Sequence, residues 1–441
     1  TNLQTRLYAE QDGELTLKVY DWGDDEVDPK GSFELTLKTL ADKDGNEPNH
    51  GGNLDGNRKK ATPLTFGEAV KGFVEFQRDE DWFKFTGKKN TVVEIQLTNA
   101  PATSTSVDYT LEMWDAKGNR RLWRMRDTNG SDGTSSHKTR RYIPEDGVYY
   151  LRVFDWDSDD YEMKDGYTLT VKSMEEPDAN EPNNGGNLDG NRSLAKPLEA
   201  GKKVSGLIEY QGDEDWFKVK LTKGQLLKVE LSNAPATSSS VDYTLEMWNA
   251  KDRRRVWRLR DTDGSDGTTV HKTIAYAPAD GDYYLRIFDW DDDDYEEKGT
   301  YSLEIEVLKD PDTKEPNNGK NFDSSKAVAT PLAKGKSELG FIQYRGDADY
   351  YVVDHKGGEL LVNLTNAPAT TSAADFTVSL HDEKGKRLER ARDTNGSDGT
   401  TTLTLKKEVP AGKYYIKVVD WDDDDFGVTE AFSISYGAKA K

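Results

Sequence analysis

The sequence contains no cysteine and only five histidines among its 441 residues. The absence of cysteine excludes disulfide bonds, thiolate zinc sites and cysteine nucleophiles. It does not fix the compartment, because disulfides are optional in larger secreted domains. No run of residues approaches the about 18 consecutive apolar side chains that a transmembrane helix needs, so we expect no membrane insertion.

Positive charge is also scarce, because 60 Lys and Arg residues stand against 82 Asp and Glu residues, a net charge of -22. Nucleic acids and anionic membranes are held by Lys and Arg patches, so we expect neither as a partner. The aromatic content of 10% is too high for a disordered chain, whereas 34% hydrophobic residues are few for one large core. This composition favours several small domains with cations as their counterions.

The usual signatures of an enzyme are missing from the sequence. There is no G-x-S-x-G, no H-E-x-x-H and no glycine loop that would bind a phosphate. His137 and His271 correspond to each other, but the third copy has Leu403 near that place. Carboxylate pairs that would suit glycoside hydrolysis are abundant, yet a catalytic pair repeated three times in one chain would be unusual. We therefore predict a protein that is not an enzyme.

Internal repeats are the strongest feature of the sequence. "NEPNHGGNLDGNR" from Asn46 recurs as "NEPNNGGNLDGNR" from Asn180 and as "KEPNNGKNFD" from Lys314, with steps of 134 residues between the copies. "DEDWF" at 79–83 recurs at 213–217 and becomes "DADYY" at 347–351. The pattern predicts three complete domains, which we call the first repeat (42–174), the second repeat (175–309) and the third repeat (310–441).

The first 41 residues match only the end of a repeat. "TRLYAEQDGELTLKVYDWGDD" aligns with "TRRYIPEDGVYYLRVFDWDSD", which places Asp21 one period of 134 residues before Asp155. Residues 1–41 therefore read as the C-terminal part of a truncated β-sandwich repeat. Because a few isolated strands expose both their core and their edges, we expect self-association through this incomplete repeat.

Apolar residues alternate with polar ones along each repeat, as in Val93, Ile95 and Leu97, and no helical stretch is apparent. Turn sequences such as "GKKN" at 87–90 and "PEDG" at 144–147 separate the runs. The sequence predicts an all-β fold of tandem antiparallel β-sandwiches, three complete and one partial, with jelly-roll-like or immunoglobulin-like topology.

Acidic loops recur at the same places in every repeat. If consecutive strands run antiparallel, these loops share one end of each sandwich, where two carboxylates at 4 Å would repel each other by about 4 kcal/mol at an effective dielectric constant near 20. Many oxygen ligands at one place suit Ca²⁺. The candidate ligands in these loops are Asp127, Asn129, Asp132, Asp155, Asp157, Asp159 and Asp160; Asp261, Asp263, Asp266, Asp289, Asp291 and Asp293; and Asp393, Asn395, Asp398, Asp420, Asp422 and Asp424.

Two other interpretations of these loops remain open. Asp, Asn and Gly are common turn residues, and "DTNGSDG" departs from the usual calcium loop, so the loops could be turns without metal. Arg126, Arg260 and Arg392, each just before a loop, could supply part of the neutralisation. Adaptation to high salt would also explain the acidity.

Four motifs follow one another in the same order along each repeat: E-P-N; then "GFVEF", "GLIEY" or "GFIQY"; then D-x-D-[WY]-[FY]; and a late G-x-Y-Y. This order resembles the bacterial pre-peptidase C-terminal domain, a family related to the collagen-binding domains of clostridial collagenases. The resemblance implies a jelly-roll-like sandwich on a secreted protein, with calcium held between an acidic linker and the D-x-D loop. Carried over to this chain, the ligands are Glu47, Asn49, Asp79 and Asp81; Glu181, Asn183, Asp213 and Asp215; and Glu315, Asn317, Asp347 and Asp349.

"RRLWRMR" and "RRRVWRLR" place tryptophans among arginines, a combination that is enriched at interfaces. The candidate binding residues are Trp123, Arg124, Trp257 and Arg258. Packing of arginine on tryptophan over a solvated sheet would explain them without a partner. The third repeat has Glu389 in place of the tryptophan, so this feature is not common to all repeats.

Together these features predict a non-catalytic, calcium-stabilised bacterial protein located outside the cell or at its surface. We expect it to serve as a fibre, surface or adhesive component, whose partner is a second copy or an extracellular polymer. The alternative is a set of substrate- or matrix-binding modules from the tail of a secreted hydrolase.

Overall fold

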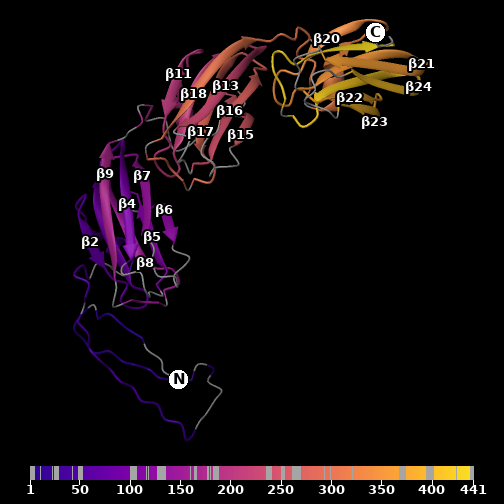
Figure 1. Cartoon of the computed structure of the whole chain (residues 1–441). Coiled ribbons are helices and arrows are strands. Elements are labelled where there is room, and N and C mark those ends of the chain that lie inside the picture. The colour runs from indigo at the N-terminus through magenta and orange to yellow at the C-terminus, as the bar shows by residue number, and fades with distance from the viewer. Residues whose placement is uncertain are drawn as a thin grey trace. The chain divides into compact units, whose positions relative to one another are not determined.

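A computed structural model describes residues 5–9, 11–21, 23, 29–41, 43–47, 53–99, 107–115, 117, 119–126, 136–158, 160–162, 166–175, 178, 180–181, 188–234, 241–249, 254–260, 270–292, 294–297, 299–319, 321–366, 374–393, 402–423 and 425–437. The chain divides into two compact units, residues 1–177 and 178–441. The first unit contains one set of packed β-sheets and the second contains two (Figure 1). The predicted fold class, tandem antiparallel β-sandwiches, is confirmed.

The first repeat forms one sheet in the order β1-β3-β8-β5-β6 and a second in the order β2-β9-β4-β7. Its elements are α1 (Leu54–Lys60), β1 (Thr62–Pro63), β2 (Ala69–Gly72), β3 (Glu80–Gly87), β4 (Thr91–Asn99), β5 (Tyr109–Trp114), β6 (Arg121–Arg126), β7 (Ser136–Ile143), β8 (Gly147–Asp155) and β9 (Tyr167–Glu175).

The second repeat has the same two sheets, in the orders β10-β12-β17-β14-β15 and β11-β18-β13-β16. Its elements are α2 (Leu188–Leu194), β10 (Lys196–Pro197), β11 (Lys203–Gly206), β12 (Glu214–Leu221), β13 (Gln225–Ala234), β14 (Tyr243–Asn249), β15 (Arg255–Arg260), β16 (Val270–Tyr276), β17 (Gly281–Asp289) and β18 (Thr300–Lys309).

In the third repeat two long strands, β21 and β24, join the two layers into one sheet in the order β20-β25-β21-β24-β22-β23. Its elements are α3 (Phe322–Val328), β19 (Thr330–Pro331), β20 (Ser337–Phe341), β21 (Asp349–Asn366), β22 (Phe376–His381), β23 (Arg387–Arg392), β24 (Thr402–Asp420) and β25 (Ala431–Tyr436). Gly357 and Gly358, at φ 95° and 96°, lie midway along β21 in a backbone conformation that favours glycine.

Alternation along the strands builds each core. In β8, Tyr149, Leu151 and Val153 are fully buried between the sheets, whereas Tyr150 and Arg152 lie on the outer face. Such a strand stabilises the sandwich because removing apolar surface from water contributes about 25 cal/mol per Å². The period-two pattern in the sequence therefore indicates correctly which side chains face the core.

The expectation of no helix was wrong, since a seven-residue helix precedes the sandwich of each repeat. In α1, the side chain of Asn53 accepts a hydrogen bond from the Gly56 amide, Asp55 lies in the first turn and basic residues lie in the last. Helices this short lack the apolar periodicity by which helices are predicted. Three two-residue strands (β1, β10 and β19) also pair in parallel, an exception to the antiparallel pattern.

The N-terminal segment, residues 5–41, contains no β-strand among its described residues. Leu17 and Leu35 align with Leu151 and Leu169, yet they are 53% and 59% exposed whereas their counterparts are completely buried. The segment contacts the first repeat near its start, where the Tyr8 ring stacks on another aromatic ring with centroids 5.6 Å apart. Side chains that form the core of a complete repeat are thus exposed in this segment.

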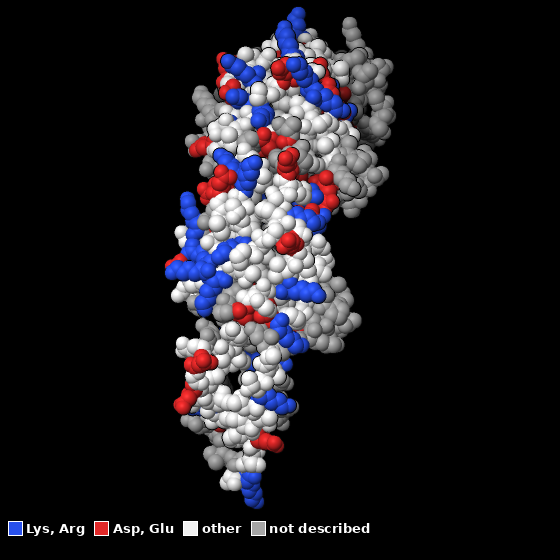
Figure 2. Space-filling model, turned by 90° about the vertical axis from the view of Figure 1, so that its left-hand side faces the viewer, with Lys and Arg blue, Asp and Glu red and all other residues white. Residues whose placement is uncertain are grey.

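The surface charges are mixed on the face turned to the viewer in Figure 2, where Lys and Arg side chains alternate with Asp and Glu. None of the described helices is both long enough and apolar enough to cross a membrane.

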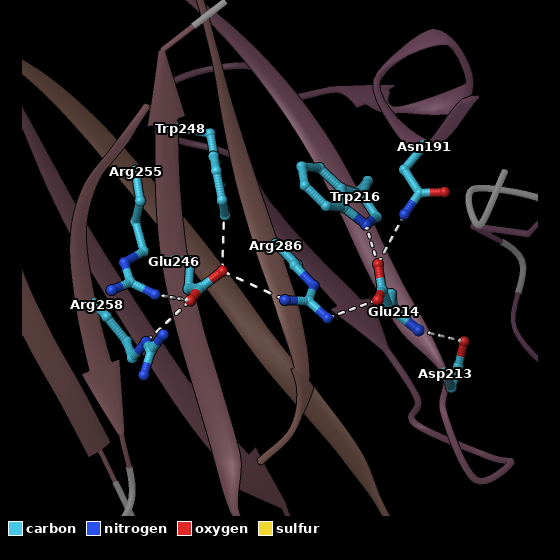
Figure 3. A network of polar contacts seen from close by, with 9 residues as sticks. All are labelled: Asn191, Asp213, Glu214, Trp216, Glu246, Trp248, Arg255, Arg258 and Arg286. Carbon is cyan, nitrogen blue, oxygen red and sulfur yellow. Dashed lines mark hydrogen bonds and ion pairs between the residues drawn. The ribbon is translucent and has the colours of Figure 1, made fainter. Parts of the chain in front are cut away.

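A polar network covers the outer face of the first sheet of the second repeat (Figure 3). The guanidinium group of Arg286 donates one hydrogen bond to Glu214 Oε1 at 2.5 Å and another to Glu246 Oε2 at 3.4 Å. The other donors to these two glutamates are Arg255, Arg258 and Trp248 on Glu246, and Trp216 and Asn191 on Glu214. The network joins α2, β12, β14, β15 and β17, so it ties the short helix to the sheet.

Candidate metal centre

Three buried carboxylate clusters, one in each repeat, are the most distinctive chemical feature of the structure. In each cluster three carboxylates offer oxygens that lie within 4.8 Å of one another, and two of the three side chains are buried. The clusters are Glu47, Asp79 and Asp81; Glu181, Glu209 and Asp213; and Glu315, Asp347 and Asp349. Each cluster therefore gathers hard oxygen donors where little solvent can screen their charge.

The linker before each sandwich supplies the first glutamate, and the turn into β3, β12 or β21 supplies the aspartates. In the first repeat Asp79 Oδ2 accepts a hydrogen bond from the Glu75 amide at 2.9 Å, which closes this turn. Asp44 in the linker accepts one from the Phe73 amide at 2.8 Å and so fixes the linker against the sandwich. The equivalent bonds recur in the other repeats, where Asp213 accepts from the Glu209 backbone amide at 3.2 Å and Asp347 accepts from the Gln343 backbone amide at 2.9 Å.

Residues of the candidate site that lie outside the described part of the chain are Asn49, Asn183, Asp127, Asn129, Asp132, Asp159, Asp261, Asp263, Asp266, Asp293, Asn395, Asp398 and Asp424. Of the three linker asparagines only Asn317 is described. It is completely buried, and its backbone N–H donates a hydrogen bond to Glu315 Oε2 at 3.1 Å. Its side-chain oxygen and Glu315 Oε1 are buried and have no hydrogen-bond donor among the described residues. Both atoms are suitable ligands for a cation.

The second aspartate of the D-x-D motif accepts a hydrogen bond from a tyrosine hydroxyl in the first two repeats but not in the third. Tyr167 donates to Asp81 Oδ2 at 2.5 Å, and Tyr301 donates to Asp215 Oδ2 at 2.6 Å. The third repeat has Phe432 at this position of β25, so the corresponding bond to Asp349 is not available. In the second repeat Glu209 takes the place of Asp215 in the cluster, and Asp215 lies beside Asp213.

Burial and mutual repulsion raise the pKa of at least one carboxyl group in each cluster. Desolvation is the largest cause at Asp81, Asp213 and Asp349, whose pKa values lie well above the usual range, and neighbouring carboxylates add to it. Desolvation and the charge of Asp347 raise the pKa of Glu315 to about 8. A cation at the cluster would supply the missing counter-charge.

These raised pKa values predict that the metal-free protein loses stability as the pH rises. Protonated Glu315 is favoured in the folded state, so its ionisation costs stability as the pH rises from its ordinary pKa, 4.5, to about 8. We expect a lower melting temperature at pH 8.5 than at pH 5.5 in chelator, measured by calorimetry. Glu315→Gln should reduce this difference, and a metal-free protein that is more stable at pH 8.5 would contradict the assignment.

Two sets of buried acidic residues at or beside the clusters were not predicted from the sequence. Asp44, with its equivalents Asp178 and Asp312, is buried in the linker, and Glu75, with its equivalent Glu209, is buried at the end of the preceding segment. Both sets recur with the 134-residue period, and the glutamates lie within the "GFVEF" and "GLIEY" motifs. Their periodic recurrence was the signal that could have identified them.

An aromatic pair adjoins the cluster of the third repeat. Tyr276, at the end of β16, stacks on Tyr344 with ring centroids 5.4 Å apart. Burial and the charges of Asp347 and Glu315 hold the pKa of Tyr344 far above its ordinary value. The phenol therefore stays protonated and can donate a hydrogen bond toward the cluster.

The loops after β8, β17 and β24 have a different local geometry. Asp155 is buried and accepts hydrogen bonds from the amides of Asp108 at 2.9 Å and Asp160 at 3.2 Å. The equivalent bonds link Asp289 with Asp242 and Asp294, and Asp420 with Asp375 and Asp425. Ser158, Asp292 and Asp423 have positive φ, as in tight turns. In the described residues these aspartates serve as turn acceptors, which is the role expected without metal.

The remaining acidic candidates that are described are scattered. Asp157, Asp291 and Asp422 are exposed. Asp393 is buried, and its amide donates to the Phe376 carbonyl at 2.9 Å. None of the four belongs to a possible metal cluster among the described residues. Metal binding by these loops stays a prediction.

In the first and third repeats the arginine that precedes the acidic loop stacks on the tryptophan that follows Asp155 or Asp420. Arg126 lies 4.2 Å from the ring centroid of Trp156 and 3.9 Å from an oxygen of Asp108. Arg392 lies 3.6 Å from the ring of Trp421. Positive charge therefore accompanies the acidic loops, as the alternative interpretation expected.

The four candidate binding residues alternate between the two faces of their strands. Trp123 and Trp257 pack partly against the cores, and Arg141 stacks on Trp123 at 4.7 Å. Arg124 and Arg258 lie over Trp156 and Trp290, at 4.7 and 4.6 Å. The structure therefore does not bring each tryptophan and its neighbouring arginine onto one face, and a partner for them stays a prediction.

The fold and the clusters define a tandem β-sandwich protein with one buried carboxylate centre per repeat. No protein-family model matches the chain, and no curated protein matches it. A solved pre-peptidase C-terminal domain of collagenase from Bacillus anthracis is 17% identical, covers 25% of this chain and 94% of its own, and has a TM-score of 0.20. The CBM22 tandem of Xyn10C from Paenibacillus barcinonensis is 10% identical, covers 53% and 84%, and has a TM-score of 0.19. At these levels neither similarity carries an argument about function, which rests on the chain's own residues.

Proposed function

We propose that the chain is a non-catalytic, secreted bacterial repeat protein of the pre-peptidase C-terminal type, whose sandwiches are stabilised by Ca²⁺. One observation carries the proposal: a buried cluster of three carboxylates forms in each repeat, and each cluster contains the linker glutamate and the first aspartate of the D-x-D turn. Its donors are all oxygens, which suit a hard divalent cation. Ca²⁺ accepts six to eight such ligands in flexible geometry, whereas Mg²⁺ usually keeps several waters, so a buried cluster of carboxylates favours Ca²⁺.

We further propose that the protein acts outside the cell or at its surface, as a fibre, surface or adhesive component that associates with its own kind. The support is the N-terminal segment, in which Leu17 and Leu35 are exposed at positions that the complete repeats bury. A second copy that covers these side chains would remove them from water.

The test of this role is the mass of the full chain in solution, measured by light scattering over a range of concentrations. We expect oligomers whose mass rises with concentration, and a monomer for the double variant Leu17→Glu/Leu35→Glu. The matched control Thr16→Glu/Thr36→Glu adds the same charge at the residues next to these leucines but leaves the leucines in place. This variant should still associate.

A wild-type chain that stays monomeric at every concentration would overturn the self-association. Binding of that monomer to insoluble collagen or polysaccharide would then favour the alternative, a substrate- or matrix-binding tail of a secreted hydrolase.

A further inference from the structure

One buried position of the candidate calcium site differs in charge between the repeats. Glu75 and Glu209 occupy it in the first two repeats, and Gln343 occupies it in the third. All three side chains are buried, at 6%, 0% and 0% exposure. The backbone N–H of each of these residues donates a hydrogen bond to the side chain of Asp79, Asp213 or Asp347, at 2.9, 3.2 and 2.9 Å. The three positions are therefore structurally equivalent.

We propose that this position sets the calcium affinity of each repeat, and that the third site is the weakest of the three. The inference rests on the proposed calcium function. In the second repeat a carboxylate oxygen of Glu209 belongs to the cluster itself, within 4.8 Å of oxygens of Glu181 and Asp213. Gln343 carries no charge at the same place, so the third site attracts a cation with one negative charge fewer.

Gln343 also has a function that a glutamate cannot perform. Its side-chain amide donates to Asp310 Oδ1 at 2.8 Å and so holds the linker to the sandwich without any ion. Asp42 and Glu176, the equivalents of Asp310, are acidic as well but lie outside the described residues. A glutamate would repel Asp310, whereas the amide tethers it.

The third cluster nevertheless keeps the features of a cation site. Asn317 contacts Glu315 and Asp349, and its buried side-chain oxygen has no hydrogen-bond donor among the described residues. The second difference at this site, Phe432 in place of Tyr167 and Tyr301, leaves an aspartate oxygen available and so acts in the opposite direction. Because a full charge on a buried ligand outweighs one neutral hydrogen bond, we expect a net weakening.

The expected consequence is a graded response. As calcium falls, the third repeat should release its ion first while the first two stay loaded. Ligand charge tunes the affinity of protein calcium sites over several orders of magnitude, so we expect the third site to be about tenfold or more weaker.

The test is a calorimetric titration of the chelator-treated full chain with CaCl₂. The wild type should show two tight sites and one weak site per chain. Gln343→Glu should strengthen the weak site by about tenfold or more, and Glu209→Gln should convert one tight site into a weak one. Ala411→Glu, which adds the same charge at an exposed position midway along β24, should leave all three sites unchanged.

The outcomes separate the inference from the proposed function. Three equal sites in the wild type, or no change on Gln343→Glu, would overturn the inference and leave the calcium function intact. Absence of any calcium binding would overturn both.

Discussion

Replacing Glu246 by alanine is expected to lower the free energy of unfolding of the second repeat by about 3 kcal/mol. Its side chain is 2% exposed and accepts hydrogen bonds from Trp248 and from three arginines, Arg255, Arg258 and Arg286. Removing one partner of a buried ion pair typically costs about 3–5 kcal/mol. The arginines are 19–41% exposed and can recover some hydration, so we expect the lower end of that range.

This effect is measured by urea unfolding followed through tryptophan fluorescence, with Glu306→Ala as the control. Glu306 forms an exposed pair with Lys228, with side chains 56% and 45% exposed, and pairs of this kind contribute about 0–1 kcal/mol. Glu112→Ala should destabilise the first repeat in the same way, because Glu112 is the equivalent residue and accepts from Arg121 and Arg152. Equal effects of Glu246→Ala and Glu306→Ala would show that the network does not stabilise the sheet.

Saturating calcium is expected to raise the melting temperature of the protein, and chelation to reverse the change. An ion that binds only the folded state at a hundred times its dissociation constant stabilises by about 2.7 kcal/mol at each site. Asp213→Asn should abolish the calcium-dependent shift of the second repeat. The carboxylate of Asp213 also accepts hydrogen bonds from the backbone amides of Glu209 and Glu214, so the calcium-dependent shift, and not the melting temperature of the metal-free protein, is the readout for this variant.

Asp289→Asn is the matched control for a turn aspartate. Its carboxylate accepts two backbone amides in the loop after β17, so the variant should lower the melting temperature with and without calcium. The calcium-dependent shift itself should be retained. If Asp213→Asn and Asp289→Asn lose the shift to the same extent, the loop and the cluster do not differ in their role.

The sequence predicts the fold well because the sandwiches obey a local rule. Alternation as in Val93, Ile95 and Leu97 specifies which side of a strand faces the core, and the period of 134 residues separates the repeats. Helix α1 escaped prediction because seven residues held by the Asn53 cap carry no apolar periodicity.

The candidate site was predictable only in part. The family resemblance indicated Glu47, Asp79 and Asp81, which the structure brings together, but not Glu75, whose position depends on the turn that Asp79 closes. The loop aspartates share an end of the sandwich with the cluster, since Glu80 at the start of β3 pairs with Phe154 near the end of β8. Strand direction alone could not show that backbone amides, rather than other carboxylates, surround Asp155.

The most direct test of the account is the number of calcium ions that the purified full chain binds, measured by equilibrium dialysis and elemental analysis. The three buried clusters predict three ions per chain at saturating calcium. A value below one ion per chain, with the protein folded, would contradict the central claim that each repeat gathers its carboxylates around a divalent cation.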